Sequence, residues 1–415
     1  MTMADASARP ADAPAAGMPR LLAAGPNARL AAHRSTFGDR PHLRVEALLA
    51  ELQASGLAGR GGAGFPAFRK LAATEGSRSR RRPAVIANGA EGEPWSWKDA
   101  VLLSNAPHLV IDGLLAVAEA VRAARIVFYV QESAQAPLLQ ALAERQDAQR
   151  VEVVVAAEAF VAGEASAVVN AIEGGGARPV DRIRRLSETG LDGRPTLLHN
   201  VETLAQLALV ARFGAAWFRS VGHPSDPGTR LVTVTGDVAT AGVVEVPTDT
   251  AIADIVRSAG GDPLHLAGVL VGGYHGTWLA PAAVSSTIDP ASLARYGAQP
   301  GAGVLHVLGD HRCGLAVTAA ITTELAAASA GQCGPCRFGL PTIAARFAEL
   351  AAGRAAPRAA DELARLAELV DGRGACHHPD GTARLVRSAL RTFGKDVHAH
   401  AAGRCTRRPG NGGGR

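Results

Sequence analysis

Two apolar runs rich in β-branched residues constrain the fold of this chain more than any other feature. They cover residues 125–131 and 150–157, and a shorter apolar run covers residues 84–87. Continuous apolar runs of this length are typical of strands buried on both faces of a parallel sheet. Helical patterns such as residues 136–145 lie between the runs. An alternation of strands and helices predicts an α/β fold.

The pattern changes twice farther along the chain. Residues 229–261 predict a strand, a glycine-containing turn, a second strand and an amphipathic helix, which is typical of a small mixed-sheet domain of β-grasp type. From residue 313 onward, apolar residues recur every three or four positions, which predicts helices. The predicted plan is a disordered leader at 1–40, an α/β domain at 41–225, a β-grasp domain at 228–300, a helical domain at 313–396 and a disordered tail at 397–415.

Charge and composition narrow the class of protein. The formal net charge of +5 is compatible either with an acidic partner or with arginines on a solvated surface, which is the commoner cause. We find no basic stripe interleaved with aromatics, so we expect no nucleic-acid binding. The sequence contains no run of about 18 uncharged apolar residues, so we expect no insertion into a membrane. The N-terminus lacks the features of a signal peptide, and we expect a cytoplasmic protein. Five cysteines, an odd number, favour a metal or cluster site over disulfides.

A glycine-rich segment, residues 56–70, provides the first candidate binding motif. Glycines at 59, 61, 62 and 64 allow the backbone to approach a ligand and expose its N–H groups. A helix is predicted to begin just after them, which places its positive end nearby. Lys70 adds a full charge and is one of three lysines in the chain, with Lys98 and Lys395. Together these features favour a phosphate group.

Three further polar motifs follow predicted strands or begin predicted helices. Asn88 and Glu91 come at the end of the run at 84–87, where ligands gather in α/β sheets. In the same motif, Glu93 and Lys98 have an alternative interpretation as an ordinary surface ion pair. The third motif, residues 158–174, has Gly163 and Glu164 at the start of a helix. The fourth places His199, Asn200 and Thr203 at another helix start, where the default role of Asn200 is capping.

These four motifs, followed by Cys333-Gly-Pro-Cys336-Arg337, resemble one family: the FMN- and NADH-binding flavoprotein subunit of respiratory complex I, shared with bacterial NAD-dependent hydrogenases and formate dehydrogenases. The resemblance runs from about Gly56 to Phe393. It implies an FMN-binding α/β domain, a β-grasp domain of SLBB type and a helical bundle with a [4Fe-4S] cluster. By position, the implied FMN cradle is Gly61, Gly62, Gly64, Lys70, Asn88, Glu91, Gly163, Glu164, Asn200 and Thr203, with Lys70 at the phosphate.

The resemblance also implies a function. It indicates an electron-transfer oxidoreductase subunit that passes electrons between a flavin and an iron–sulfur cluster. The redox partner would be a ferredoxin or another electron-transfer subunit, and the basic charge favours an acidic one. The implied metal ligands are Cys333, Cys336 and Cys376.

The chain departs from the family pattern where NADH is expected to bind. A carboxylate is replaced by Ala165 and a tyrosine by Phe160, and no aromatic follows Lys70, where Ala73 stands. Arg182 aligns with the family's basic residue, and Arg185 takes the place of a phenylalanine in an adenine sandwich. Because each aromatic stack is worth about 0.5–1.5 kcal/mol beyond burial, we predict weak NADH binding and weak or no NADH oxidation.

The cluster motif departs too, because Ala330 stands where the family has its first cysteine. His377 and His378 are candidates for the missing ligand, since imidazole can replace thiolate on iron. Cys405 on the tail is a third candidate. Cys313 is discounted, because a helix would place it about 25 Å away. An iron open to water, or a three-iron cluster, completes the alternatives for this position.

Two rival classes remain at the level of sequence. In the first, the three cysteines and one histidine form a closed Cys3His zinc site. In the second, the chain is a structural paralogue that has lost both the cluster and the NADH site.

Overall fold

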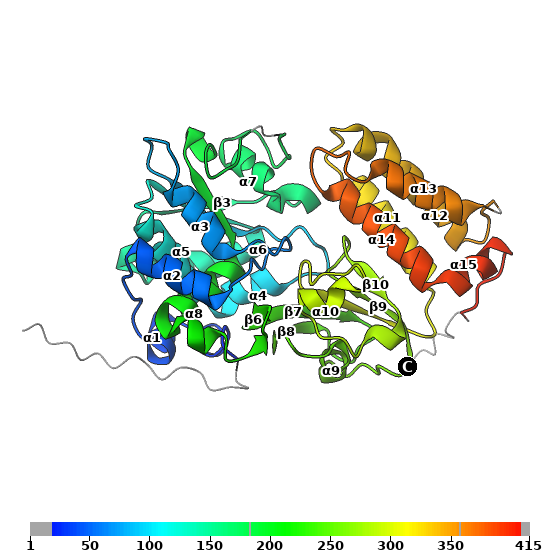
Figure 1. Ribbon diagram of the computed structural model, residues 1–415, viewed down its shortest axis with the longest axis horizontal. Helices are drawn as coiled ribbons and strands as arrows, with labels where there is room; N and C mark the ends of the chain where they lie inside the picture. The colour runs from blue at the N-terminus through cyan, green and yellow to red at the C-terminus, as the bar shows by residue number, and fades with distance from the viewer. Residues whose placement is uncertain (1–18, 182–183, 357, 408–415) are drawn as a thin grey trace, which may run out of the picture.

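The computed structural model describes residues 19–181, 184–356 and 358–407, and its elements form three groups (Figure 1). The first group is built on a parallel sheet with the strand order β3-β2-β1-β4. Its strands are β1 (Ala84–Gly89), β2 (Arg125–Val130), β3 (Val151–Val155) and β4 (Thr196–Asn200). The predicted parallel strands are confirmed. However, β3 is only half-buried, because it is an edge strand of the sheet.

Helices cover both faces of this sheet. Alternate residues of β1 explain why, since Val85 and Ala87 enter one apolar core while Ala84 and Ile86 enter another. The larger core is closed by α2 (Val45–Ser55), α4 (Lys98–Asn105), α5 (Pro107–Ala120), α6 (Glu132–Ala143) and α8 (Val201–Phe218). The smaller core is closed by α7 (Ala165–Ile172). α3 (Ala67–Glu75) packs beside β4.

The second group is a five-stranded mixed sheet with the order β10-β9-β11-β7-β8. Its strands are β7 (Thr229–Gly236), β8 (Gly242–Pro247), β9 (Leu266–Val271), β10 (Thr277–Leu279) and β11 (Val304–Gly309), with α9 (Ile252–Ser258) and α10 (Pro290–Ala294) beside them. A short hairpin of β5 (Gly222–His223) and β6 (Asp226–Pro227) precedes it. The predicted strand, turn, strand and helix appear in order. The sheet continues through β11, past the predicted boundary at residue 300.

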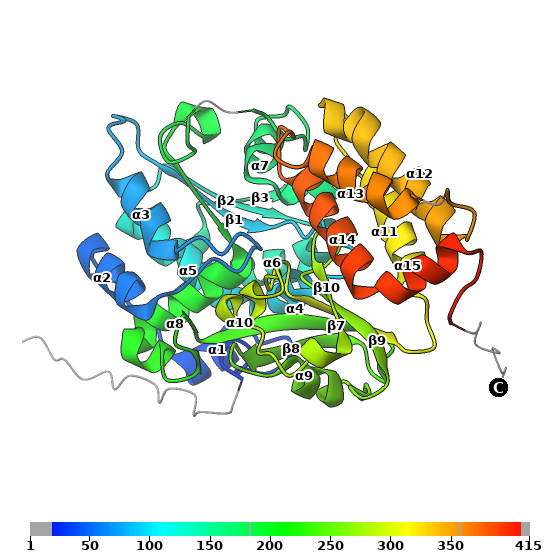
Figure 2. The ribbon, with the colours of Figure 1, turned by 45° about the vertical axis from the view of Figure 1, so that its right-hand side comes forward.

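The third group is helical, as predicted. It contains α11 (Gly314–Ala327), a π-helix at Pro335–Gly339, α12 (Leu340–Ala351), α13 (Ala359–Val370), α14 (His378–Thr392) and α15 (Gly394–Ala401). Its core also includes Leu270 and Trp278 of the mixed sheet, so the bundle packs directly on that sheet. In both views the beginning of α14 lies beside α7 (Figures 1 and 2).

The expected disorder at the two ends is wrong where the structure describes them. Residues 20–22 donate backbone N–H groups to the Glu245 carboxylate of β8, at 2.9–3.2 Å, and Leu21 is fully buried. α1 (Leu30–Phe37) follows, so the predicted leader at 1–40 contains ordered structure from residue 19. At the other end α15 continues through Ala401, past the predicted boundary at 396. The first 18 and last eight residues lie outside the described part.

No single helix among the described residues is long and apolar enough to cross a membrane. The pair α4 and α5 passes that test only jointly, with a bend of 94° between them. Most residues of α5 are buried in the core of the parallel sheet.

Candidate functional site

A cavity of about 450 Å³ opens where the three groups meet. β1 and β4 are neighbours in the parallel sheet, and their register pairs Asn88 with Asn200 at the carboxyl edge. The glycine-rich segment and the loop before α7 line the cavity from the first group. Gly272 and Gly301 line it from the mixed sheet, and Cys376 lines it from the helical group. Ligands of open α/β proteins collect at this edge of the sheet.

Most of the predicted flavin-site residues reach this cavity. Those that line it are Gly61, Gly62, Asn88, Glu91, Gly163, Glu164 and Asn200. Gly64, Lys70 and Thr203 are not among the lining residues. The predicted residues that line the cavity therefore converge from four separate motifs.

The glycine-rich loop is anchored by Arg60, which sequence reasoning missed. Its guanidinium is fully buried, pairs with Asp226 at 2.7 Å and donates to the Pro227 carbonyl at 3.0 Å. Its backbone N–H donates to Thr203 Oγ1 at 2.9 Å, so Thr203 holds the loop and does not face the cavity. Gly62, with φ of +103°, takes a conformation that side chains disfavour. An arginine inside a glycine run is the signal that could have indicated an anchor.

Lys70 lies on α3 with its side chain directed at the end of β4. Its Nζ donates to the Leu198 carbonyl at 3.0 Å, and burial lowers the pKa of its ammonium. Within the described residues it makes no ion pair. Its charge also lowers the pKa of His199, although burial is the larger cause of that value of about 3. A half-buried cation without an acidic partner is a ready counter-charge for an anion.

Asn88 joins the two loops that frame the cavity. Its side-chain amide donates to the Gly163 carbonyl at 2.9 Å and accepts from the Ala90 N–H at 3.1 Å. A side chain at Gly163 would place its Cβ 2.7 Å from the Ala90 carbonyl oxygen, so the close approach of the loops needs glycine there.

Glu164 and Asn200 both cap helices. The Glu164 carboxylate accepts the N–H groups of Ser166 and Ala167 at 2.9 and 3.0 Å, at the start of α7. The Asn200 side-chain oxygen accepts the Glu202 N–H at 3.0 Å, at the start of α8. The default capping role of Asn200 is therefore present, and both residues still line the cavity.

A buried polar network forms the floor of the cavity. Lys98 pairs with Asp99 at 2.5 Å and with Glu202 at 3.1 Å. Burial opposes its charge, but these carboxylates, Asp99 first, raise the pKa of the ammonium. Glu91 accepts the Ser96 hydroxyl and the Asp99 N–H. Burial, followed by the Asp99 charge, raises the pKa of Glu91 to about 8.

The interpretation of Glu93 and Lys98 as a surface ion pair is wrong. Both side chains are buried, and each has other partners. Glu93 accepts the N–H groups of Tyr274 at 2.8 Å and Trp95 at 3.3 Å, and burial raises its pKa to about 7. Glu93, Lys98 and Asp99 line the cavity, although sequence reasoning did not assign them to the site.

The structure brings the three predicted metal ligands, here called the cluster cysteines, to one place: Cys333, Cys336 and Cys376. Cys336 lies in the π-helix, and burial raises the pKa of its thiol to about 12, with further contributions from the other two cysteines. Burial opposes the Cys333 thiolate, but N–H groups of Cys336 and Ala375 lower its pKa. Burial raises the pKa of the Cys376 thiol, and the charge of Glu164 raises it further.

The structure shows which candidates for the fourth ligand have a ligand atom available near the cluster cysteines. Both ring nitrogens of His378 are engaged, with the Leu325 carbonyl at 2.8 Å and with His275 at 3.1 Å. The exposed His377 bonds Asp380 through Nδ1 at 2.9 Å, which leaves Nε2 as its ligating atom. Cys405 lies at the Cys313 end of α11, about 20 Å along that helix from its other end. This distance agrees with the expectation that Cys313 is not a ligand of the cluster.

Among the described residues, the sulfur atoms of the three cluster cysteines do not all lie within 4.8 Å of one another. Sulfur ligands of a tetrahedral zinc ion lie about 3.8 Å apart. Within the described residues, the group of three donors whose ligand atoms all lie within 4.8 Å of one another is a different one, at the far end of the bundle. The wider spacing favours a multinuclear cluster.

The residues that replace the family's NADH contacts are also placed by the structure. Phe160 packs against His275 and His378, with ring centroids 4.7 and 5.3 Å away. Ala165 is the first residue of α7, while Ala73 and Arg185 are exposed. Arg182 lies outside the described residues.

Comparison with known proteins agrees with this architecture. Residues 52–209 match the Nuo51 FMN-binding domain, and residues 316–400 match the NADH-ubiquinone oxidoreductase-F iron-sulfur binding region. The chain is 31% identical over 351 residues to the mitochondrial NADH dehydrogenase [ubiquinone] flavoprotein 1 of Dictyostelium discoideum, covering 76% of this chain and 71% of that protein. It is 29% identical to the F-type NADH-quinone oxidoreductase subunit of Salmonella typhimurium, covering 72% of each.

A solved structure gives the same result. The chain superposes on a chain of an NAD⁺-reducing [NiFe]-hydrogenase in the H2-reduced state with a TM-score of 0.79 and 32% identity, covering 88% of this chain. The match spans 64% of that hydrogenase chain, which is the longer of the two. The shared fold, the two matched regions and the identity over most of a full-length relative lead to one conclusion: this chain belongs to the family of F-type flavoprotein subunits of NADH-quinone oxidoreductases, to which the flavoprotein subunits of NAD-linked hydrogenases are related.

Proposed function

We propose that this chain is an electron-transfer subunit that binds FMN in the cavity and an iron–sulfur cluster on the cluster cysteines. The observation that carries the proposal is that Cys376 and the glycine-rich loop line the same cavity. A flavin placed there would lie next to a cluster ligand, which is the arrangement that electron transfer between the two requires.

The cavity residues fit a flavin nucleotide in size and charge. The cavity volume of about 450 Å³ is within the usual range for cofactor sites. Gly61 and Gly62 bring the backbone of the glycine-rich loop to the cavity, and Lys70 offers a cation without an acidic partner in the described residues. The polar edge of a flavin ring would meet Asn88 and Glu91. Bound FMN would supply the conversion of a two-electron donor into single-electron transfers.

The protein's own residues would manage protons beside that ring. Since the pKa of Glu91 is raised to about 8 and that of Glu93 to about 7, these buried carboxyl groups exchange protons near neutral pH. Lys98 and Asp99 form a fixed charge pair next to them.

We infer that the redox partner is another electron-transfer protein, such as a ferredoxin or a further subunit of a complex. The relatives' names describe subunits, which supports a multi-subunit setting. Beside Cys336, the exposed Arg337 and the 70% exposed Phe338 form a basic and apolar surface. Such a surface suits an acidic partner that docks over the cluster. We place the protein in the cytoplasm.

The test is reconstitution of the full chain under anaerobic conditions. We expect about one FMN per chain by absorbance, and iron with acid-labile sulfide by chemical analysis and EPR. Cys376→Ser should lose the cluster and retain FMN, and Cys405→Ser is the matched control that should retain both. Absence of flavin binding after reconstitution would refute the FMN assignment. Stoichiometric zinc without sulfide on the cluster cysteines would refute the cluster.

A further inference from the structure

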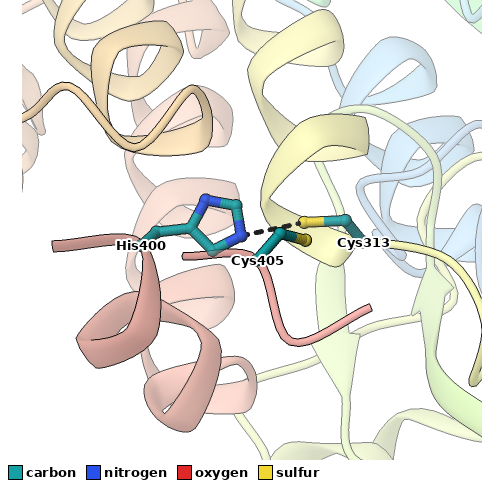
Figure 3. A group of neighbouring side chains, drawn as sticks. All are labelled: Cys313, His400 and Cys405. Carbon is teal, nitrogen blue, oxygen red and sulfur yellow. Dashed lines mark hydrogen bonds between the residues drawn. The ribbon is translucent and has the colours of Figure 1, made fainter. Parts of the chain in front are cut away.

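A second group of metal-binding side chains lies at the opposite end of the helical bundle from the cluster cysteines. Cys313, His400 and Cys405 present ligand atoms that all lie within 4.8 Å of one another. They come from three places: the residue before α11, the end of α15 and the segment that follows α15. Figure 3 shows the three side chains converging on one point. We propose that these three residues bind a zinc ion.

The distances match a tetrahedral zinc ion. Zinc lies about 2.3 Å from a thiolate and about 2.0–2.1 Å from an imidazole nitrogen, which places the two ligand atoms about 3.5 Å apart. Cys313 Sγ and His400 Nε2 are 3.5 Å apart. The exposure of Cys405 leaves that side open to a water molecule as the fourth ligand.

The histidine is held in the form that binds metal. His400 is buried, and its Nδ1 lies 3.2 Å from the Leu350 carbonyl at the end of α12. Because a carbonyl can only accept, Nδ1 carries the proton and Nε2 directs its lone pair at Cys313. A backbone carbonyl bonded to the distal ring nitrogen is the usual support of a zinc-bound histidine.

The segment that carries Cys405 is fixed on both sides. Upstream, the Gly403 N–H donates to the His400 carbonyl at 2.9 Å, which turns the chain back over α15. Downstream, Thr406 bonds Asp396, and Arg407 donates to the Asp310 carbonyl at 2.7 Å. Cys405 is thus held beside two ligands by contacts that do not involve its own side chain.

Two soft thiolates and one imidazole select zinc over calcium or magnesium, which prefer oxygen ligands. The ion would join the beginning of α11 to the end of α15, at least about 20 Å from the cluster cysteines along α11. It would therefore join these two segments and would take no part in the flavin site.

The test is metal analysis of full chains prepared anaerobically with zinc and passed through a chelating resin. We expect about one zinc per chain in the wild type and in Cys333→Ser, which damages only the iron site. Zinc should be lost in Cys405→Ser and His400→Ala. His398→Ala, an exposed histidine on the same helix, is the matched control and should keep zinc. Because Cys405 is exposed, its serine variant should fold, which circular dichroism checks.

Cobalt substitution gives a second measurement that does not depend on the flavin or on iron. Cobalt bound by thiolates in a tetrahedral site should add visible absorption that disappears in Cys405→Ser and persists in Cys333→Ser. Zinc retained in Cys405→Ser, zinc lost in Cys333→Ser, or a Cys313–Cys405 disulfide in protein kept from oxygen would each overturn the proposal.

Discussion

Lys70 is the residue whose charge we expect to govern flavin retention. Replacing it by alanine removes the cation that has no acidic partner in the described structure, so a bound phosphate would lose its counter-charge. We predict that the FMN affinity of Lys70→Ala falls about 10²-fold or more, while the protein stays folded. Fluorescence titration with FMN measures the loss, and Lys395→Ala, at an exposed lysine on α15, is the control. Equal affinity in the two variants would refute the role of Lys70.

Glu93 is expected to make stability depend on pH. Burial raises its pKa from 4.5 to about 7, so between these values the folded state binds a proton that the unfolded state releases. Its contribution to stability is fully present below about pH 4.5 and is lost as pH rises through about 7. Relative to wild type, Glu93→Gln should therefore gain up to about 3 kcal/mol of unfolding free energy between about pH 5 and pH 8.

Urea unfolding at the two pH values measures this difference. Glu75→Gln, at an exposed carboxylate on α3, should show no such gain. Parallel stability curves for Glu93→Gln and wild type would contradict the prediction.

At the scale of elements, the sequence predicted the strands and helices well but could not place all side chains. The runs at 84–87 and 125–131 became central strands because their apolar pattern allows burial on both faces. Residues 150–157 have the same pattern, but β3 is an edge strand, and no local signal distinguishes edge from centre. The burial of Lys98 and the anchoring by Arg60 depend on partners far along the chain, Glu202 and Asp226. Such contacts depend on how distant elements pack together, so the local sequence around Lys98 or Arg60 does not indicate them.

The segment between α11 and α12 holds the incomplete cluster motif. In Ala330→Cys a fourth thiolate would be available, so a cluster there should lose its exchangeable iron and its midpoint potential should fall. We predict several-fold slower bleaching in air, followed by absorbance, and a changed EPR signal. Ser329→Cys, one residue earlier, is the control that should behave like wild type. Identical bleaching in both variants would show that position 330 does not face the cluster.

For the whole molecule, we predict slow reduction of bound FMN by NADH. The resemblance implies a carboxylate and an aromatic where this chain has Ala165 and Arg185, and this difference should weaken NADH binding about 10²-fold or more relative to a typical member. Stopped-flow absorbance measures the rate, and dithionite, which needs no binding site, should reduce the same flavin quickly. Ala165→Glu restores the carboxylate and should accelerate the NADH reaction. The substitution should not destabilise α7, because a carboxylate in the first turn of a helix is favourable. Fast reduction at micromolar NADH in wild type would show that other residues have taken over.

The contact between residues 20–22 and Glu245 has a consequence for self-association. β8 is the edge strand of the mixed sheet, and open sheet edges pair readily with other chains. The N-terminal segment packs on this strand through the Glu245 carboxylate, which accepts three of its N–H groups, and Leu21 is fully buried. A chain shortened to begin at residue 25, which removes residues 20–22 and keeps α1, should therefore aggregate in a concentration-dependent way, which light scattering would detect. A monodisperse shortened chain would show that β8 does not pair with other chains when these residues are removed. Aggregation would show that these few residues prevent fibre-like association through the sheet.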